Sequence, residues 1–422
     1  MPMRRPTPTR RPTPMRRPTP MRRREFLSLS TLAAGGALLG ARLSFAHSAA
    51  RRGSRFVLVI LRGALDGMAA VPPCGDRDYG ALRGAFALRA PGVAGSALPL
   101  DGFFGLHPSL GFLQQCYAAH ELTVLHALAT PYRERSHFDG QDVLENGAAH
   151  PHALQSGWLN RALAQLPAPQ PREAGVALGQ NLPLVMRGPA AVTSWSPSRL
   201  GAPDDDTLAR LSDLYAGDAL LAARLADALA ANAIAGEDLS AAAPARSAVS
   251  NARYAEVVRA AAGFLRQENG PRVAVFDTTG WDTHANEGAA EGQLAGRLGV
   301  LDASLATLRQ ELGATWRDTA VLLVTEFGRT AAINGTRGTD HGTATVAFLV
   351  GGAVAGGHVI ADWPGLSARA LYQGRDLAPT LDLRSVLKGV LADHLEVPPR
   401  ALEQVVFPDS AGAVPLHGLM RG

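Results

Sequence analysis

Five short runs of aliphatic and β-branched residues recur along the chain after its first fifty residues. They lie at residues 55–63, 122–128, 272–278, 320–326 and 345–352. Apolar runs of this length without polar alternation are typical of strands that are buried on both faces of a parallel sheet. We therefore expect five strands of one largely parallel sheet.

Helical periodicity fills the stretches between these runs. Apolar residues recur every three or four positions, most clearly at 294–312. An Ala-rich block at about 204–250 has the same character and reads as ordinary outer helices or as an inserted cap. Strands alternating with helices predict an α/β fold: a three-layer sandwich with a mostly parallel central sheet, in a single domain at 55–420.

Residues 1–46 read as a leader. The motif RRPTP repeats three times from Arg4, a Pro-rich basic tract that is unsuited to burying a core. Arg23 and Arg24 then precede Phe-Leu, a weakly apolar stretch and small residues up to Ala46. This pattern resembles a twin-arginine export signal, with an ordinary secretory signal as the alternative. We expect the twin-arginine translocase as a partner and a periplasmic or secreted mature protein.

The sequence leaves two possible starts for this leader. Met21 stands directly before the arginines and is as plausible a start as Met1. Cleavage is expected after Ala46, with residues 47–54 as a linker to the domain.

Charge and composition exclude several classes of protein. Ten of the 41 basic residues but only one of the 37 acidic residues lie within 1–46, so the remainder carries 31 basic and 36 acidic side chains. The basic balance thus belongs to the leader, and no nucleic-acid partner is indicated. No apolar run after the leader is long enough to span a bilayer. Cys74 and Cys116 fit either one disulfide or two free thiols.

Acidic, imidazole and hydroxyl side chains gather where the predicted strands end. Ligands of open α/β sheets bind at the carboxyl ends of the strands, and carboxylate and imidazole groups converging from different elements are what Zn, Mn or Mg requires. We predict a divalent-metal site, of one ion or two, at these positions. The candidate ligands are Asp66, His137, Asp282, His284, Glu326, Asp340 and His341, and Ser136 and Arg329 lie beside them in the sequence.

Each residue also has an ordinary structural explanation. Asp66 precedes Gly67, a common turn pair, and Ser136 with Asp139 has the spacing of a helix capping box. A single histidine is more often structural than a ligand. We assign structural roles to His107, His120, His126, His150, His152, His358 and His394.

Several motifs resemble a known family. They include LVILRGALDGM, GWDTHAN, TEFGRT and GTDHG, and the resemblance runs from about Arg55 to Leu395, weakest across the Ala-rich block. Such motifs resemble bacterial proteins of domain of unknown function family 1501, which are often exported by the twin-arginine route. That family resembles the alkaline-phosphatase-like superfamily, which includes sulfatases and cofactor-independent phosphoglycerate mutases.

The resemblance implies roles for these residues. Asp66 would be the first metal ligand, Ser136 the nucleophile and His341 the last histidine ligand. Asp282 and His284 would serve one metal, with Asp277 as the alternative to Asp282.

Phe327, beside Glu326, stands where the superfamily has a histidine, and His137 could replace that ligand.

The sequence thus favours an exported metal-dependent hydrolase of phosphate or sulfate esters. One ion would lie at Asp66 and Glu326 and a second at Asp282, His284 and His341, while Arg329 or Arg135 neutralises the developing charge. The alternative, favoured by Phe327, is a degenerate member of the fold that binds a glycan, polymer or partner protein in the cell envelope. No nicotinamide fingerprint, P-loop or GxSxG motif is present.

Overall fold

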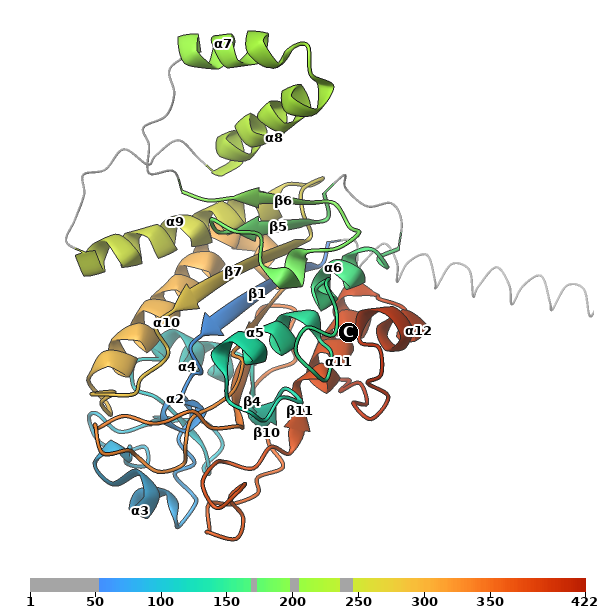
Figure 1. Cartoon of the computed structure of the whole chain (residues 1–422). Helices are drawn as coiled ribbons and strands as arrows, with labels where there is room; N and C mark the ends of the chain where they lie inside the picture. Colours follow the sequence, from blue (N-terminus) through green and yellow to red (C-terminus); the bar gives the residue numbers. More distant parts are fainter. Residues whose placement is uncertain (1–52, 168–172, 198–204, 236–245) are drawn as a thin grey trace, which may run out of the picture. The chain divides into compact units, whose positions relative to one another are not determined.

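The computed structural model describes residues 53–167, 173–197, 205–235 and 246–422 (Figure 1). The predicted leader and most of the predicted linker lie outside the described residues. From Gly53 to Gly422 the chain forms one compact unit.

A nine-stranded sheet forms the centre of this unit, in the order β10-β4-β9-β8-β1-β7-β5-β6 with β11 beside β4. Its strands are β1 (Arg55–Arg62), β4 (Leu122–Ala129), β5 (Gly175–Leu178), β6 (Val192–Trp195), β7 (Val273–Thr279), β8 (Thr319–Val324), β9 (Thr345–Val350), β10 (His358–Ile360) and β11 (Leu381–Asp382). A separate two-stranded sheet joins β2 (Leu98–Pro99) and β3 (Gly105–Leu106).

The five predicted strands are confirmed, and one of them runs in an unexpected direction. Strand β1 pairs in parallel with β7 and β8, and the other pairings are parallel as well, except that β9 is antiparallel to both β4 and β8. The prediction of a mostly parallel sheet is therefore confirmed, whereas parallel pairing of β9 is wrong. The reversal brings the residues just before β9 to the edge where the other strands end.

The described helices are α2 (Gly67–Ala70), α3 (Tyr79–Arg83), α4 (Gly111–Ala118), α5 (His137–Asn146), α6 (Trp158–Leu163), α7 (Asp205–Tyr215), α8 (Ala219–Ala235), α9 (Arg246–Arg266), α10 (Gln293–Leu312), α11 (Leu383–Leu395) and α12 (Pro399–Ala401). Shorter helical turns lie at Gly84–Phe86, Leu184–Met186, Gly313–Asp318 and Leu402–Val406. Within the described ranges, no helix is both long and apolar enough to cross a membrane.

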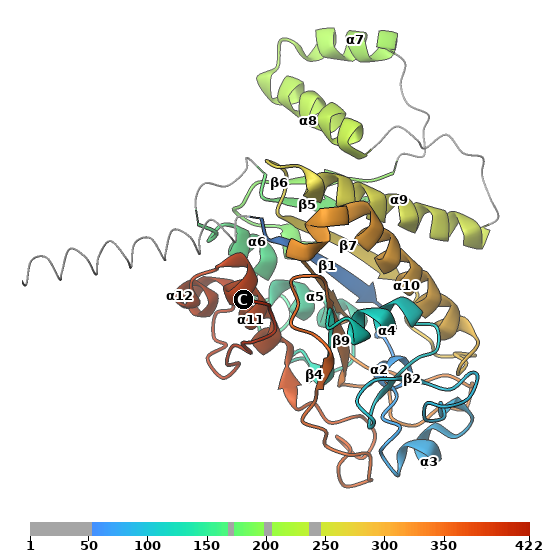
Figure 2. The same ribbon diagram turned by 180° about the vertical axis from the view of Figure 1, so that it is seen from behind.

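Both faces of the sheet are covered by helices. Alternate residues of β1 point to opposite faces, as strand geometry dictates. Val57 and Val59 pack into the core beneath α4, α9 and α10, whereas Phe56 and Leu58 pack into the core beneath α6 and α11. Figure 1 looks onto α5, α6 and α11, and Figure 2 onto α4 and α10. The described chain is thus an α/β protein with helical layers on both sides of the sheet.

The Ala-rich block supplies α7, α8 and α9. Val258 and Leu265 of α9 are buried in the core that α9 shares with α10. Helix α8 contacts α9 and the edge strand β6, where the Trp195 indole donates to Asn232 Oδ1 at 3.2 Å. Helices α8 and α9 therefore cover the β6 side of the sheet as outer helices.

Candidate metal centre

Two glycines bring the loop before β9 against its neighbours. A Cβ on Gly338 would lie 2.3 Å from the carbonyl carbon of His284, and one on Gly342 would lie 2.4 Å from that of Arg329. Since real Cβ atoms essentially never approach backbone this closely, only glycine permits this contact. The loop that carries Asp340 and His341 is thereby packed onto the segments that follow β7 and β8.

Three imidazoles converge on one carboxylate at this edge. The Nε2 atoms of His284 and His341 lie 3.0 and 3.3 Å from Asp282 Oδ1, and His137 Nε2 lies 3.4 Å from Asp282 Oδ2. The Nε2 atoms of His284 and His341 are only 2.9 Å apart. His137, Asp282 and His341 form the one group able to hold a metal ion within the described ranges.

Acceptors behind the histidines determine which ring nitrogen faces inward. Glu326 Oε1 lies 2.8 Å from Nδ1 of His137, Asp340 Oδ1 lies 3.4 Å from Nδ1 of His284, and the Arg135 carbonyl lies 2.9 Å from Nδ1 of His341. Because each acceptor takes an Nδ1 proton, each neutral ring presents an Nε2 lone pair to the centre. This is the arrangement by which carboxylates and carbonyls orient metal-binding histidines.

The spacing of these atoms suits a single small cation. Two ligand atoms about 2.1 Å from a tetrahedral metal lie about 3.4 Å apart, close to the distances around Asp282. Lone pairs of His284 and His341 at 2.9 Å repel each other unless a cation or a proton lies between them. The residues present therefore fit a divalent ion such as zinc, held by His137, Asp282 and His341, with His284 beside Asp282 and His341.

Local electrostatics keep the carboxylate charged. Burial alone would raise the pKa of Asp282, but the Arg329 guanidinium and the neighbouring histidines lower it overall. Burial lowers the pKa of His341, and the charge of His137 lowers it further, so this ring is held neutral. The hydrogen bond to Glu326 raises the pKa of His137, with a smaller opposing contribution from burial. Protons thus compete with a metal chiefly at His137.

Glu326 holds His137 in this arrangement. The prediction that Glu326 is a metal ligand is therefore corrected. Its side chain is fully buried, and besides His137 its oxygens accept from the Gly63 amide at 2.9 Å, the Gln141 amide at 3.1 Å and the Thr325 hydroxyl at 2.9 Å. These donors use the lone pairs that a metal would need. Glu326 therefore positions His137.

The Phe327 ring packs against two histidines of the cluster. Its ring stacks on His137 with centroids 5.0 Å apart and lies 5.3 Å from His341. Gly140 of α5 makes room, because a Cβ there would lie 2.9 Å from the Phe327 ring. The aromatic ring thus packs behind two of the histidines.

The two predicted catalytic arginines do not point freely into the centre. Arg329 is fully buried and forms an ion pair with Asp282 at 2.9 Å, so its charge acts on the centre through that carboxylate. The Arg135 guanidinium is held by Asp376 at 2.7 Å and Gln373 at 2.8 Å. Only the backbone carbonyl of Arg135 contacts the histidine cluster, so its predicted role in charge neutralisation is not supported.

The Asp66 carboxylate is bound by other protein groups. The prediction that Asp66 is the first metal ligand is therefore corrected. Its carboxylate caps α2 by accepting from the Ala69 amide at 3.0 Å and forms a two-point ion pair with Arg83, at 2.8 Å for the second contact. Both residues are buried. The alternative ligand, Asp277, is paired with Arg62. The second predicted ion, at Asp66 and Glu326, therefore finds no ligand set among the described residues.

Ser136 stands at the N-cap of α5, as expected for a helix start. The capping-box hypothesis is wrong, however, because its side chain makes no cap hydrogen bond. Ser136 lies between Arg135, whose carbonyl contacts His341, and His137. Its hydroxyl therefore makes no hydrogen bond to the helix, and Ser136 is the chain neighbour of His137.

Glu287 is a buried acid that the sequence analysis missed. Its Oε2 accepts from the Thr339 hydroxyl at 2.7 Å, while Oε1 has no hydrogen-bond donor. Burial and the neighbouring Asp66 raise the pKa of Glu287 to about 8. We infer that Glu287 is protonated and donates to Asp66, next to Arg83.

This acid predicts a pH dependence of stability. The pKa of Glu287 is raised from 4.5 to about 8 on folding, so stability is lost as pH rises from about 4.5 to 8, while the unfolded chain alone releases the proton. We expect Glu287→Gln to match wild type at pH 5 and to gain roughly 1–3 kcal/mol at pH 8.5. Urea unfolding at both pH values measures this, with the exposed Glu291→Gln as control. An equal effect at both pH values would contradict it.

The remaining histidines and the cysteines have ordinary surroundings. His107, His126 and His394 each contact a backbone carbonyl, those of Ala289, Val71 and Arg55, at 2.8 to 3.0 Å. Burial lowers the pKa of His126 to about 4, which keeps it neutral. Cys74 and Cys116 are both free thiols. Of the two alternatives predicted from the sequence, the structure has two free thiols rather than a disulfide.

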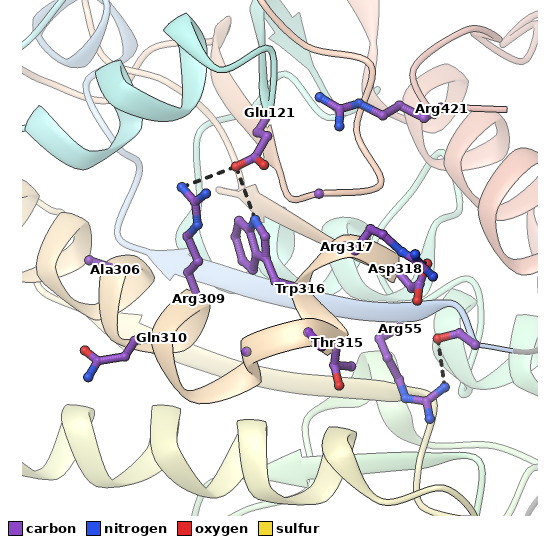
Figure 3. Close-up of a pocket in the computed structure, with 14 residues that line it drawn as sticks. Arg55, Glu121, Ala306, Arg309, Gln310, Thr315, Trp316, Arg317, Asp318 and Arg421 are labelled. Atoms are coloured by element: carbon purple, nitrogen blue, oxygen red, sulfur yellow. Dashed lines mark hydrogen bonds and ion pairs between the residues drawn. The ribbon is translucent and has the colours of Figure 1, made fainter.

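A large cavity lies at the opposite edge of the sheet, where β1 begins (Figure 3). It measures about 910 Å³ and is lined by Arg55 at the start of β1 and by Asp318 just before β8. Its charges are satisfied locally: Arg309 pairs with Glu121 at 3.3 Å, and the Arg55 guanidinium donates to backbone carbonyls. The cavity is therefore remote from the strand ends that carry the histidines.

The fold and the cluster define an α/β protein with a three-histidine, one-carboxylate centre at the carboxyl edge of its sheet. The chain belongs to the family described as Protein of unknown function (DUF1501), whose model matches residues 107–406. This match confirms the family resemblance seen in the sequence.

Solved structures are similar only at low scores. Ps i-CgsB, in complex with k-i-k-neocarrahexaose, has a TM-score of 0.40 and 11% identity, covering 86% of this chain and 77% of that chain. The lipoteichoic acid synthase LtaP from Listeria monocytogenes has a TM-score of 0.37 and 9% identity, covering 85% and 75%. No curated protein sequence matches this chain.

Proposed function

We propose that this protein is an exported, metal-dependent hydrolase of phosphate or sulfate esters with an alkaline-phosphatase-like fold. The observation that carries the proposal is the convergence of three Nε2 atoms on Asp282, each histidine being oriented from behind by an acceptor at Nδ1. The lone pairs of His284 and His341 repel each other unless a cation or a proton lies between them. The arrangement therefore supports the binding of a metal ion.

The residues around the centre have distinct roles in this proposal. When bound, a divalent ion would act as a Lewis acid on a phosphoryl or sulfuryl oxygen. Arg329 keeps Asp282 ionised, and Glu326 holds His137. Ser136, whose hydroxyl is free of the helix cap, lies at the N-terminus of α5, where backbone amides favour an anion. This placement supports Ser136 as the nucleophile.

The reaction has two balanced stages. Ser136 Oγ forms a bond to phosphorus or sulfur and loses its proton, while the ester oxygen leaves with its electron pair and takes up a proton. Water then forms the new bond to phosphorus or sulfur and restores the Ser136 hydroxyl. The net change consumes one ester and one water and releases an alcohol and phosphate or sulfate.

A substitution at Ser136 tests this role. We expect Ser136→Ala to lower kcat roughly 1000-fold with little change in KM, because the group that forms the new bond is removed. The assay uses zinc-loaded protein with aryl phosphates, diesters and aryl sulfates, and the exposed Ser194→Ala as control. Turnover of no ester by metal-replete wild type would overturn the hydrolase. Full activity of Ser136→Ala would transfer the role of nucleophile to water.

A second function is favoured by two observations. Phe327 fills the floor of the centre, and Asp66 is neutralised by Arg83, so a single ion is the most that the described residues support. A protein that binds an envelope glycan, polymer or partner protein through this edge would need no second ion. If Ser136→Ala and His341→Ala both kept the cellular role intact, the binding function would replace the catalytic one.

Export through the twin-arginine translocase belongs to the same proposal. We expect Arg23→Lys with Arg24→Lys to abolish export, because the pair is the recognised feature of such signals. Fractionation of cells into periplasm and cytoplasm measures the result, with Arg16→Lys and Arg17→Lys in the upstream tract as the control. Unchanged export of the double variant would indicate an ordinary secretory signal.

A further inference from the structure

A small cavity adjoins the histidine cluster through Asp340. It measures about 250 Å³ and is lined by residues of three separate segments, among them Leu82, Ile333, Asp340, Leu371 and Arg375. Asp340 Oδ1 lies 3.4 Å from Nδ1 of His284, and the next residue is the ligand His341. None of His137, Asp282, His284 and His341 lines the cavity, which contacts the cluster through Asp340, behind His284.

The polar groups of the cavity are nearly balanced in charge. The Asp340 and Arg375 side chains are 50% and 42% exposed, so both reach solvent, and Arg375 also forms an ion pair at 3.4 Å with the buried Asp376. Asp340 Oδ1 is used by His284 and Asn334, whereas Oδ2 has no hydrogen-bond partner among the described residues. A carboxylate and a guanidinium together suit a neutral group whose hydroxyls both donate and accept.

The other lining side chains are mixed: Leu82, Ile333 and Leu371 are apolar, whereas Thr330 and Asn334 are polar. Leu371 is buried with Leu82 packed beside it in a small core cluster, and Ile333 lines the cavity from the loop after β8. Apolar side chains that face a carboxylate and a guanidinium match a ring with C–H faces and hydroxyl edges. The volume is below the roughly 300–1000 Å³ of typical ligand pockets, so the cavity holds one ring rather than a chain of rings.

We propose that this cavity binds the organic part of the ester, and that this part is a neutral polyhydroxylated ring, such as one hexose unit. The inference rests on the proposed function, since the ester group would lie at the histidine cluster while its ring occupies the cavity beside Asp340. Asp340 then has two roles: Oδ1 positions His284, and Oδ2 accepts from a ring hydroxyl.

Two variants test the cavity without altering the metal ligands. Ala332→Trp fills the cavity from an exposed position, and Arg375→Ala removes the guanidinium. The control is Arg369→Ala, an exposed arginine that does not line the cavity. Zinc content and circular dichroism verify that each variant keeps its centre and fold.

The kinetic readout compares a hexose monophosphate with methyl phosphate, and the corresponding sulfates. We expect wild type to prefer the hexose ester in kcat/KM, and Ala332→Trp and Arg375→Ala each to lower that preference about tenfold. Arg369→Ala keeps the preference of wild type. Equal kcat/KM for both esters in wild type, or a preference unaffected by both variants, overturns the proposal.

A binding readout separates this inference from the proposed function. Saturation-transfer NMR with free hexose detects the ring in zinc-loaded wild type, and Ala332→Trp should remove the signal. Hexose binding without turnover of any ester supports the cavity and overturns the hydrolase. Ester turnover without hexose preference or binding supports the hydrolase and overturns the cavity. Neither turnover nor binding overturns both.

Discussion

His341→Ala is expected to lose the divalent ion and the thermal stability that the ion confers. The substitution removes one of three converging Nε2 atoms and leaves His137, His284 and Asp282. Loss of a residue that merely supports a ligand typically weakens metal binding 10–100-fold, and loss of the ligand itself should cost at least on the order of 100-fold. At 100 times Kd, a bound ion stabilises a fold by about 2.7 kcal/mol, which the variant would forfeit.

Elemental analysis after dialysis and Tm with and without zinc measure this result. The matched control is His152→Ala, because His152 also lies beside two carboxylates, 3.6 Å from Asp139 and 3.4 Å from Asp142, but is 71% exposed. Wild type and the control should each hold about one ion per chain. Metal retained by His341→Ala, or lost equally from the control, would contradict the centre.

Two milder variants test the carboxylates that orient the histidines through Nδ1. Glu326→Gln and Asp340→Asn keep the side-chain shape but weaken the acceptors for His137 and His284. We expect metal affinity to fall roughly 10–100-fold in each, less than in His341→Ala. Titration with a competing zinc chelator measures these affinities. If Glu326→Gln lost the metal as completely as His341→Ala, Glu326 would be a ligand after all.

The hydrophobic pattern predicted the sheet because buried strands need continuous apolar runs. Residues 55–63 and 345–352 both have this signature, and they form β1 and β9. The same pattern carries no information on strand direction, so the antiparallel course of β9 was missed. The short strands β5 and β6 were missed too, since four-residue runs in polar surroundings give a weak signal.

Sequence position predicted which residues lie at the carboxyl edge of the sheet. It did not predict which of them face the centre and which hold a ligand from behind. Asp282 and Glu326 both follow strands, yet Asp282 lies among the imidazoles while Glu326 lies behind His137. That order depends on backbone donors such as the Gly63 amide, which no local motif encodes. Glu287 was overlooked for a similar reason: a glutamate in a Gly- and Ala-rich loop reads as exposed until Asp66 and Thr339 are placed around it.

Arg83→Met is expected to destabilise the fold by about 3–5 kcal/mol, because breaking a buried ion pair leaves an uncompensated charge. Arg83 and Asp66 are each 1% exposed, and Glu287 lies against them with a carboxyl oxygen that has no donor. Methionine keeps most of the side-chain volume, so the effect would report the lost charge rather than a cavity. Urea unfolding at pH 7 measures it, with the exposed Arg89→Met as control.

The double variant Arg83→Met with Asp66→Asn distinguishes charge from packing. Removing both charges should recover part of the loss, since no unpaired ion then remains at that position. No recovery, or a loss below about 1 kcal/mol in the single variant, would show that the pair is not what holds this region. Because Thr339 joins Glu287 to the loop that carries His341, we also expect weaker zinc binding in Arg83→Met than in Arg89→Met. The Arg83–Asp66 ion pair, which lies where the sequence predicted a second metal ion, would then stabilise the loop that binds the ion at the histidine cluster.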